Sequence, residues 1–205
     1  MKARPSTAVF DIGNVLIGWD PRNLYRQLFA RQEEMEWFLG NVCTGAWNLE
    51  QDRGRSFAEG VSHLFSDHPE HLHPLIRAYD ERWREMLSGE ITGSVEILGS
   101  LRKSATPLYA ITNWNQDKFR EARGLYPFLE WFDGIVVSGE EGLLKPDPAI
   151  FQLLFDRYGV AAEDCVFIDD SARNVRGAEA IGMQGVLFET PEKLAADLRA
   201  LGFSL

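Results

Sequence analysis

The stretch AVFDIGNVLIGWD, residues 8–20, begins with an apolar run and then meets a carboxylate at Asp11. A short, continuous apolar run is typical of a strand that is buried on both faces of a parallel sheet. Such a strand is an unusual place for a charge, because a buried carboxylate needs a partner or a bound cation. Asp11 therefore calls for an explanation, and so does Gly13 two positions later.

Runs of the same character recur along the chain, each bounded by polar residues or glycine. They lie at 7–12, 106–112, 133–138, 165–170 and 184–189. Segments that are predicted to be helical precede, separate or follow them, at 94–104, 115–126, 148–159, 171–182 and 191–202. Because strands alternate with helices, the sequence predicts an α/β fold with a doubly wound parallel sheet.

One region interrupts this alternation. Residues 21–87 contain no convincing strand, and the amphipathic segments in it are predicted to be helices at 23–40, 56–68 and 74–87. Amphipathic helices bury one face against a neighbour, so we predict a small all-helical cap that is inserted after the first strand. The expected division is a core of residues 1–18 and 89–205 and a cap of residues 19–88.

Composition narrows the class of partner. The chain has 205 residues and a formal net charge of -10. An acidic chain repels nucleic-acid phosphates and anionic lipid, so we expect a small-molecule substrate rather than a nucleic acid or a membrane. No signal peptide or long apolar span is evident, and Cys43 and Cys165 lie in apolar surroundings, so we expect reduced thiols in a cytoplasmic protein. The sequence leaves open whether the protein is a monomer or a homodimer.

Four features with reactive side chains fall at the carboxyl ends of predicted strands, the edge where open α/β sheets bind ligands. They are Asp11, the pair Thr112 and Asn113, Lys145 in GLLKPDP, and the acid pair Asp169 and Asp170. A carboxylate can attack phosphorus and form an aspartyl-phosphate, while a hydroxyl or a lysine can hold phosphoryl oxygens. Adjacent carboxylates suit Mg²⁺, a hard cation that prefers oxygen ligands. The set as a whole favours phosphoryl transfer.

Each feature also has a purely structural interpretation when it is taken alone. Asp11 can begin a loop, and the polar residues after the second strand can cap the next helix. Lys145 can be a solvated surface lysine. The adjacent acids Asp169 and Asp170 repel each other, however, and a bound cation accounts for them better than helix capping does. The combination on one edge of one sheet is more specific than any of its members.

These motifs resemble those of the haloacid dehalogenase-like (HAD) superfamily of hydrolases over nearly the whole chain. FDIGNVL is similar to the first motif of that superfamily, ITN to the second, KPDP to the third and FIDDSARN to the fourth. The stretch FDGIVVSGEEGLLKPDPAIF is also characteristic. The resemblance implies a Rossmann-like core with a helical cap of the subfamily I type, and Mg²⁺-dependent hydrolysis of a phosphomonoester.

The resemblance also implies roles for individual residues. Asp11 would be the nucleophile. Phosphate binding would fall to Thr112, Asn113 and Lys145, of which Lys145 also takes part in catalysis. Metal ligation would fall to Asp11, the backbone carbonyl of Gly13, Asp169 and Asp170.

Gly13 departs from the usual pattern of the phosphatases in this superfamily. They carry a second aspartate at this position, which protonates the leaving oxygen and then activates water. A missing general acid–base group costs roughly two to four powers of ten in rate. The segment nevertheless resembles bacterial α-D-glucose-1-phosphate phosphatases of the superfamily, which are active with this glycine. We therefore predict a phosphatase and regard a sugar phosphate as the candidate substrate.

A nearby acid is one hypothesis for the missing proton donor. Asp20, or a cap acid such as Glu50 or Asp52, could supply the proton. The alternative for Asp20 is a helix cap ahead of Pro21. A sugar 1-phosphate offers another explanation, because its anomeric oxygen is comparatively easy to expel.

We expect substrate specificity to reside in TGAWNLEQDRGRSF, residues 44–57, which is predicted to be a loop of the cap. Its residues Trp47, Asn48 and Arg53 could face a hydroxyl-rich substrate. The alternative is a polar turn between helices with Trp47 buried.

Two other functions compete with the phosphatase prediction. A 2-haloacid dehalogenase would release halide without a metal, and the acid pair Asp169 and Asp170 argues against it. A non-catalytic protein that binds a phosphorylated metabolite would keep the pocket but lack turnover, and Gly13 keeps that alternative open.

Overall fold

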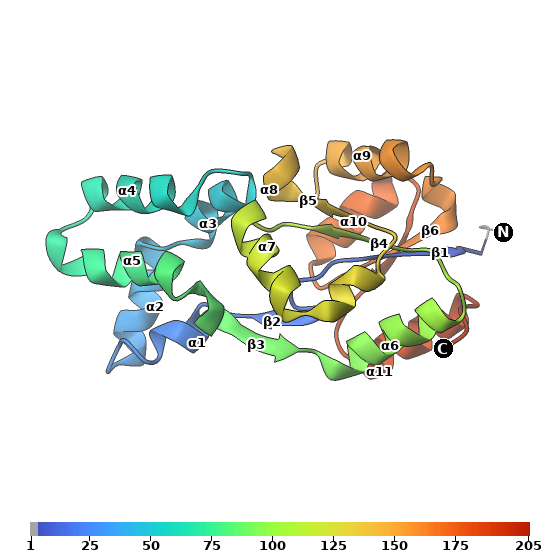
Figure 1. Ribbon diagram of the computed structural model, residues 1–205, viewed down its shortest axis with the longest axis horizontal. Helices are drawn as coiled ribbons and strands as arrows, with labels where there is room; N and C mark the ends of the chain where they lie inside the picture. The colour runs from blue at the N-terminus through green and yellow to red at the C-terminus, as the bar shows by residue number, and fades with distance from the viewer. Residues whose placement is uncertain (1–3) are drawn as a thin grey trace.

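A five-stranded parallel sheet forms the centre of the computed structural model, which describes residues 4–205 (Figure 1). The spatial order of the strands is β5-β4-β1-β6-β7. Their bounds are β1 Thr7–Phe10, β4 Leu108–Thr112, β5 Gly134–Val137, β6 Cys165–Asp169 and β7 Gln184–Leu187. All five correspond to predicted runs, and the predicted α/β fold with a parallel sheet is confirmed.

Strand β1 lies in the middle of the sheet and is paired along both edges. Ala8 aligns with Leu108 of β4 on one side and with Val166 of β6 on the other. Ala8 and Phe10 pack into one apolar core, whereas Val9 packs into a second one. Because both faces of the strand are covered, its sequence is continuously apolar instead of alternating.

Helices cover both faces of this sheet (Figure 1). Helices α6 and α11 contribute to the core that holds Phe10, and α9 and α10 contribute to the core that holds Val9. The helices that follow β3 are α6 Thr92–Lys103, α7 Gln116–Leu125, η3 Pro127–Trp131, α8 Ser138–Glu141, α9 Pro148–Tyr158, η4 Ala162–Asp164, α10 Ala172–Ala180 and α11 Pro191–Ala200. The arrangement is the doubly wound one that the alternation predicts.

The segment between β2 and β3 forms a further set of helices, here called the inserted helices. They lie at one end of the molecule, and the five-stranded sheet with its covering helices lies at the other (Figure 1). They are α1 Arg22–Tyr25, α2 Gln32–Asn41, α3 Gly45–Asp52, α4 Phe57–Asp67, η1 Glu70–Leu72, α5 His73–Glu81 and η2 Trp83–Met86. An antiparallel ribbon of two strands, β2 Ile17–Trp19 and β3 Leu87–Glu90, leads the chain out to them and back. The chain between the ribbon strands therefore contains helices only.

The inserted helices differ from the predicted segments in two places. The segment 23–40 forms α1 and α2 with a bend between them, and the bend lets Tyr25 and Phe29 pack their rings on Phe38 at 5.0 and 5.5 Å between centroids. The segment 44–57, which was expected to be a loop, contains helix α3 with Thr44 as its cap. Thr44 accepts a hydrogen bond from the Trp47 N–H, which is the signature of a helix start.

The β2–β3 ribbon is absent from the sequence-based prediction. Its strands have three and four residues, too few for a periodic pattern to emerge. Gly89 adopts a φ of 96°, a left-handed conformation that favours glycine and that breaks any strand-like pattern in this stretch.

The core packing of α9 supports a prediction about stability. Phe151 has 0% of its surface exposed, and its ring meets the edge of Phe167 at 5.2 Å between centroids. Phe151→Ala is expected to lower the free energy of unfolding by about 3–5 kcal/mol, because it leaves a cavity in a closely packed core. Urea denaturation measures this change. Leu125→Ala, at a side chain that is 44% exposed, is the control, and an equal loss in both variants would contradict the assignment of the core.

Two further predictions from the sequence can be compared with the structure. Cys43 and Cys165 are both buried and free of any disulfide. Within residues 4–205, no helix is both long enough and apolar enough to cross a membrane.

Candidate active site

The predicted site residues come together at the carboxyl edge of three neighbouring strands. Asp11 follows β1, Thr112 ends β4 and Asp169 ends β6, and these strands are adjacent in the sheet. Parallel strands end at the same edge, so residues far apart in sequence become neighbours there. Lys145 reaches this edge from the loop between α8 and α9.

Lys145 forms the centre of the cluster. Its Nζ lies 2.8 Å from Oδ1 of Asp11 and 2.8 Å from Oδ2 of Asp169. Its side chain is 1% exposed, so it is a buried cation between two carboxylates and not a solvated surface lysine. Asn113 holds the backbone of this residue, because its Nδ2 donates to the Lys145 carbonyl at 3.2 Å and its Oδ1 accepts from the Lys145 N–H at 2.8 Å. Asn113 therefore positions the lysine as well as lining the cavity described below.

Asp169 is fixed by several donors. Its Oδ1 accepts from the Ser171 N–H at 2.8 Å, and Asn174 donates to both carboxylate oxygens at 3.0 and 3.2 Å. Asp170, the next residue, instead lines the cavity. Oxygens of Asp11, Asp169 and Asp170 all lie within 4.8 Å of one another, close enough to share one metal ion.

Burial, together with the neighbouring charges, shifts the pKa values of Asp11, Asp170 and Lys145. Burial raises the pKa of Asp11 to about 7, with Lys145 opposing the shift and the charges of Asp169 and Asp170 adding to it. Burial also raises the pKa of Asp170, and the charge of Asp169 adds to that effect. For Lys145, burial is outweighed by the attraction of Asp11 and Asp169, so its pKa is raised and it stays charged. The cluster carries more negative than positive charge, which favours a cation.

The turn after β1 shapes one wall of the site. Asn14 adopts a φ of 55°, a left-handed conformation that asparagine tolerates. Its Oδ1 accepts from the Trp19 N–H at 2.9 Å, and its side chain also donates to Asp170. Gly13 lines the cavity, and a Cβ atom built on it would have no other atom within 4 Å. Asn14 belongs to the FDIGNVL motif, but the sequence alone does not predict its contact with Asp170.

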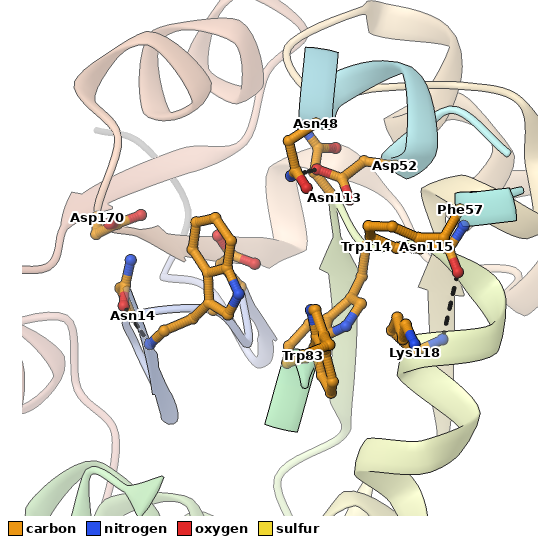
Figure 2. A pocket seen from close by; sticks show the side chains of 13 residues that line it. Asn14, Asn48, Asp52, Phe57, Trp83, Asn113, Trp114, Asn115, Lys118 and Asp170 are labelled. Atoms are coloured by element: carbon orange, nitrogen blue, oxygen red, sulfur yellow. Dashed lines mark hydrogen bonds between the residues drawn. The ribbon is translucent and has the colours of Figure 1, made fainter. Parts of the chain in front are cut away.

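A cavity of about 160 Å³ opens above Asp11, between the sheet edge and the inserted helices. Figure 2 shows its lining from close by. The lining residues are Asp11, Gly13, Asn14, Trp19, Asn48, Asp52, Phe57, Trp83, Asn113, Trp114, Asn115, Lys118 and Asp170. Trp19 lies on β2, Trp83 on η2, Trp114 in the loop after β4 and Lys118 on α7. No motif in the sequence predicts that they converge.

The candidate specificity residues separate into two groups. Asn48 lines the cavity, whereas Trp47 and Arg53 do not. Trp47 is 8% exposed, donates its Nε1–H to the Gly60 carbonyl at 3.1 Å and packs on Tyr79. It is therefore buried, as the alternative interpretation predicts. Arg53 is half exposed and lies near Glu50. Helix α3 turns only one face to the cavity, so of these three residues only Asn48 reaches it.

The candidate proton donors also differ in position. Asp20 and Glu50 lie outside the lining, whereas Asp52 belongs to it. Asp20 accepts from the Arg22 N–H at 2.9 Å, but the residue at the N-cap position of α1 is Pro21, so Asp20 lies one residue before the cap position. Asp52 is the acid of the inserted helices that reaches the cavity.

Thr112 ends β4 with its side chain fully buried. Its hydroxyl has no hydrogen-bond partner among residues 4–205, and the residue lies beside the cavity lining without being part of it. A buried hydroxyl without a partner is costly, which favours an oxygen of a ligand as its partner.

Comparisons with known proteins agree with this geometry. The profile of the haloacid dehalogenase-like hydrolases matches residues 5–182. The sesquiterpene phosphatase astK of Aspergillus oryzae is 25% identical over 194 residues, which are 95% of this chain and 95% of that protein. The drimenol cyclase drtB of Aspergillus calidoustus is 28% identical over 93% of this chain, but the chain spans only 35% of that protein. A HAD family enzyme from Bacteroides thetaiotaomicron, solved as a magnesium complex, shares the fold with a TM-score of 0.75 at 20% identity, over 96% of this chain and 100% of that one.

Proposed function

The chain belongs to the haloacid dehalogenase-like hydrolase family, and from this premise we propose that it is a Mg²⁺-dependent phosphomonoester hydrolase. The observation that carries the proposal is the position of Lys145, 2.8 Å from both Asp11 and Asp169 at the carboxyl edge of the sheet. A buried cation beside a nucleophilic carboxylate suits the transfer of a doubly negative phosphoryl group. The relative from Aspergillus oryzae, whose name describes a phosphatase, supports the same reaction class.

The donor set fits Mg²⁺. This ion prefers oxygen ligands and is commonly held by one or two carboxylates together with substrate phosphate. Asp11 and Asp170 would hold it, with the Gly13 carbonyl as a further ligand. Asp169 would orient the site, since its oxygens already accept hydrogen bonds from Lys145, Ser171 and Asn174. When bound, the ion would neutralise charge on the transferring phosphoryl group.

The residues of the chain perform the remaining steps. The Asp11 carboxylate attacks phosphorus in line and forms an aspartyl-phosphate, and water then hydrolyses it. Lys145 favours the ionised form of Asp11 that attacks, and it stabilises the negative charge of the phosphoryl oxygens. Thr112 offers its buried hydroxyl to one of these oxygens.

The substrate is proposed to be a small phosphorylated metabolite, with sugar phosphates as the first candidates. The cavity combines the aromatic rings of Trp19, Trp83 and Trp114 with the polar side chains of Asn48 and Lys118. Cavities with apolar walls and few polar groups bind ligands that offer both kinds of surface, as a sugar ring does. A screen of sugar phosphates, amino-acid phosphates and prenyl phosphates, with phosphate release as the readout, identifies the class.

Removal of the metal is expected to abolish turnover. EDTA should reduce phosphate release from p-nitrophenyl phosphate to background, and excess Mg²⁺ should restore it, because the three carboxylates otherwise repel the substrate. Release of phosphate that is unchanged in EDTA would contradict the proposal.

The two competing functions give different results in the same assay. A 2-haloacid dehalogenase releases halide from 2-chloropropionate and is indifferent to EDTA. A protein that only binds phosphorylated metabolites gives no phosphate from any ester, although its melting temperature rises with ligand. The cluster of Asp11, Asp169 and Asp170, which suits a metal ion, argues against the dehalogenase, and turnover in this assay decides between the hydrolase and the binding protein.

A further inference from the structure

On the core side of the site, each carboxyl group among residues 4–205 already has another task, and Asp170, which lines the cavity, is a proposed metal ligand. Asp11 and Asp169 are both bound to Lys145, and Gly13 has no side chain. In an in-line displacement the leaving oxygen points away from the nucleophile, toward the wall of the cavity that the inserted helices form. An alkoxide is a poor leaving group, so an acid on that wall would have a large effect on the rate.

Asp52 is the carboxyl group on that wall. It is the last residue of α3, and Figure 2 shows it beside Asn48, across the cavity from Asn14 and Asp170. Asn48 Nδ2 donates to Oδ2 of Asp52 at 3.0 Å. The Tyr79 hydroxyl donates to Asn48 Oδ1 at 3.1 Å, which orients the amide with its NH₂ group toward the acid. Among residues 4–205, no lysine or arginine forms an ion pair with Asp52.

The backbone of α3 is fixed to the core at this point. Ser138 Oγ donates to the Asp52 carbonyl at 2.6 Å. Asn115 Nδ2 donates to the carbonyls of Gln51 and Arg55 at 3.1 and 3.2 Å. These contacts come from the residues after β4 and β5, so the same edge that carries the nucleophile also positions the acid.

We propose that Asp52 is the general acid and base of the reaction and replaces the carboxyl group that is missing at Gly13. The proposal rests on the phosphatase function proposed above. In the first step the Asp11 oxygen bonds to phosphorus, the bond from phosphorus to the leaving oxygen breaks, and that oxygen takes the proton of Asp52. In the second step water attacks phosphorus and gives a proton back to Asp52, while the bond to Asp11 breaks. The sum is hydrolysis of the ester to an alcohol and phosphate.

The surroundings of Asp52 keep it protonated. Burial raises its pKa to about 8, the backbone N–H of Asn115 opposes the shift, and the charge of Asp11 adds to it. The other charged or titratable groups around it are Asp170 at the end of β6, Lys118 on α7 and Tyr79 on α5.

Lys118 forms ion pairs with other acids and therefore does not stabilise a negative charge on Asp52. Its Nζ lies 2.7 Å from Asp80 Oδ1 and 3.5 Å from Glu121 Oε1. A protonated Asp52 acts as an acid below its pKa, so kcat/KM should fall as the pH rises through about 8.

The test compares esters with good and poor leaving groups in Asp52→Asn. For a sugar 6-phosphate or another alkyl phosphate, kcat/KM should fall by about two to four powers of ten, because the alkoxide then leaves without a proton. For p-nitrophenyl phosphate, whose phenolate is a stable anion, the loss in kcat/KM should be much smaller. The fall of kcat/KM above pH 8 should disappear in the variant. Glu50→Gln, on the exposed side of the same helix, is the matched control.

The second step offers an independent readout. With p-nitrophenyl phosphate, Asp52→Asn should release one equivalent of p-nitrophenolate in a burst. The aspartyl-phosphate forms normally in the variant, but its hydrolysis is slow because no base activates the water. Gly13→Asp in the Asp52→Asn background should recover part of the activity toward alkyl phosphates, since Gly13 lines the same cavity and has room for a side chain.

The outcomes separate this proposal from the phosphatase function. If wild-type protein hydrolyses phosphate esters but Asp52→Asn loses the same factor for both ester classes and keeps its fall at high pH, Asp52 is not the acid. A rise in KM alone would assign Asp52 to substrate binding and would also overturn the proposal. If wild-type protein hydrolyses no phosphate ester, the phosphatase function itself fails.

Discussion

Asp11→Asn is expected to abolish turnover of every phosphate ester that the wild-type protein accepts. An amide cannot form the acyl-phosphate, so kcat should fall by about four powers of ten or more, as it does when a nucleophile is removed from other enzymes. The fold should survive, because Lys145 keeps its second partner, Asp169, at 2.8 Å. Phosphate release under saturating Mg²⁺ measures the loss, and mass spectrometry of acid-quenched enzyme should detect phosphorylated protein only when Asp11 is present.

Asp20→Asn is the matched control for this experiment. It replaces a carboxylate by an amide in the same stretch, residues 8–20, but at a position outside the cavity lining. Asp20 bonds to the Arg22 N–H, so its loss should affect the start of α1 and leave kcat and the pH profile unchanged. Turnover that persists in Asp11→Asn would mean that water, and not this carboxylate, attacks phosphorus.

The sheet and its reactive edge were predictable because both depend on local sequence. Each buried strand is a short apolar run with a distinct end, and the first polar residue after such a run lies at the carboxyl edge of the sheet. The convergence of Asp11, Thr112 and Asp169 can therefore be predicted without any knowledge of tertiary packing. Lys145 could be placed in the same cluster by its residue type, but its 1% exposure and its bonds to two carboxylates could not be predicted.

The wall formed by the inserted helices was less predictable because it depends on how α3 docks. Trp47, Asn48 and Asp52 lie within six positions on one helix, and the sequence does not say which face turns toward Asp11. The contacts that decide it come from Ser138 and Asn115, which are distant in sequence. The packing of Trp47 on Tyr79 has the same origin.

Lys145→Met is expected to destabilise the protein and to abolish its activity. It leaves the buried carboxylates of Asp11 and Asp169 without their cation, and breaking a buried ion pair in this way costs about 3–5 kcal/mol. Burial then raises the pKa of Asp11 further above its unfolded value, so the folded state binds more protons than the unfolded state. The free energy of unfolding of the variant should therefore decrease more steeply than that of the wild type as the pH rises from about 4 toward neutral.

Urea denaturation in EDTA at several pH values measures this effect, because the chelator prevents a metal ion from replacing the lost charge. Lys193→Met is the matched control. Its Nζ also lies 2.9 Å from a carboxylate, that of Asp197, but the lysine side chain is 43% exposed, and solvent screens the pair. The control should show no measurable change in stability or turnover.

Equal behaviour of the two variants would mean that Lys145 is an ordinary surface lysine, and the electrostatic basis of the proposed site would be lost. A large loss confined to Lys145→Met, and largest near neutral pH, would instead show that the charge balance among Lys145, Asp11 and Asp169 holds the sheet edge together as well as preparing it to bind a phosphoryl group.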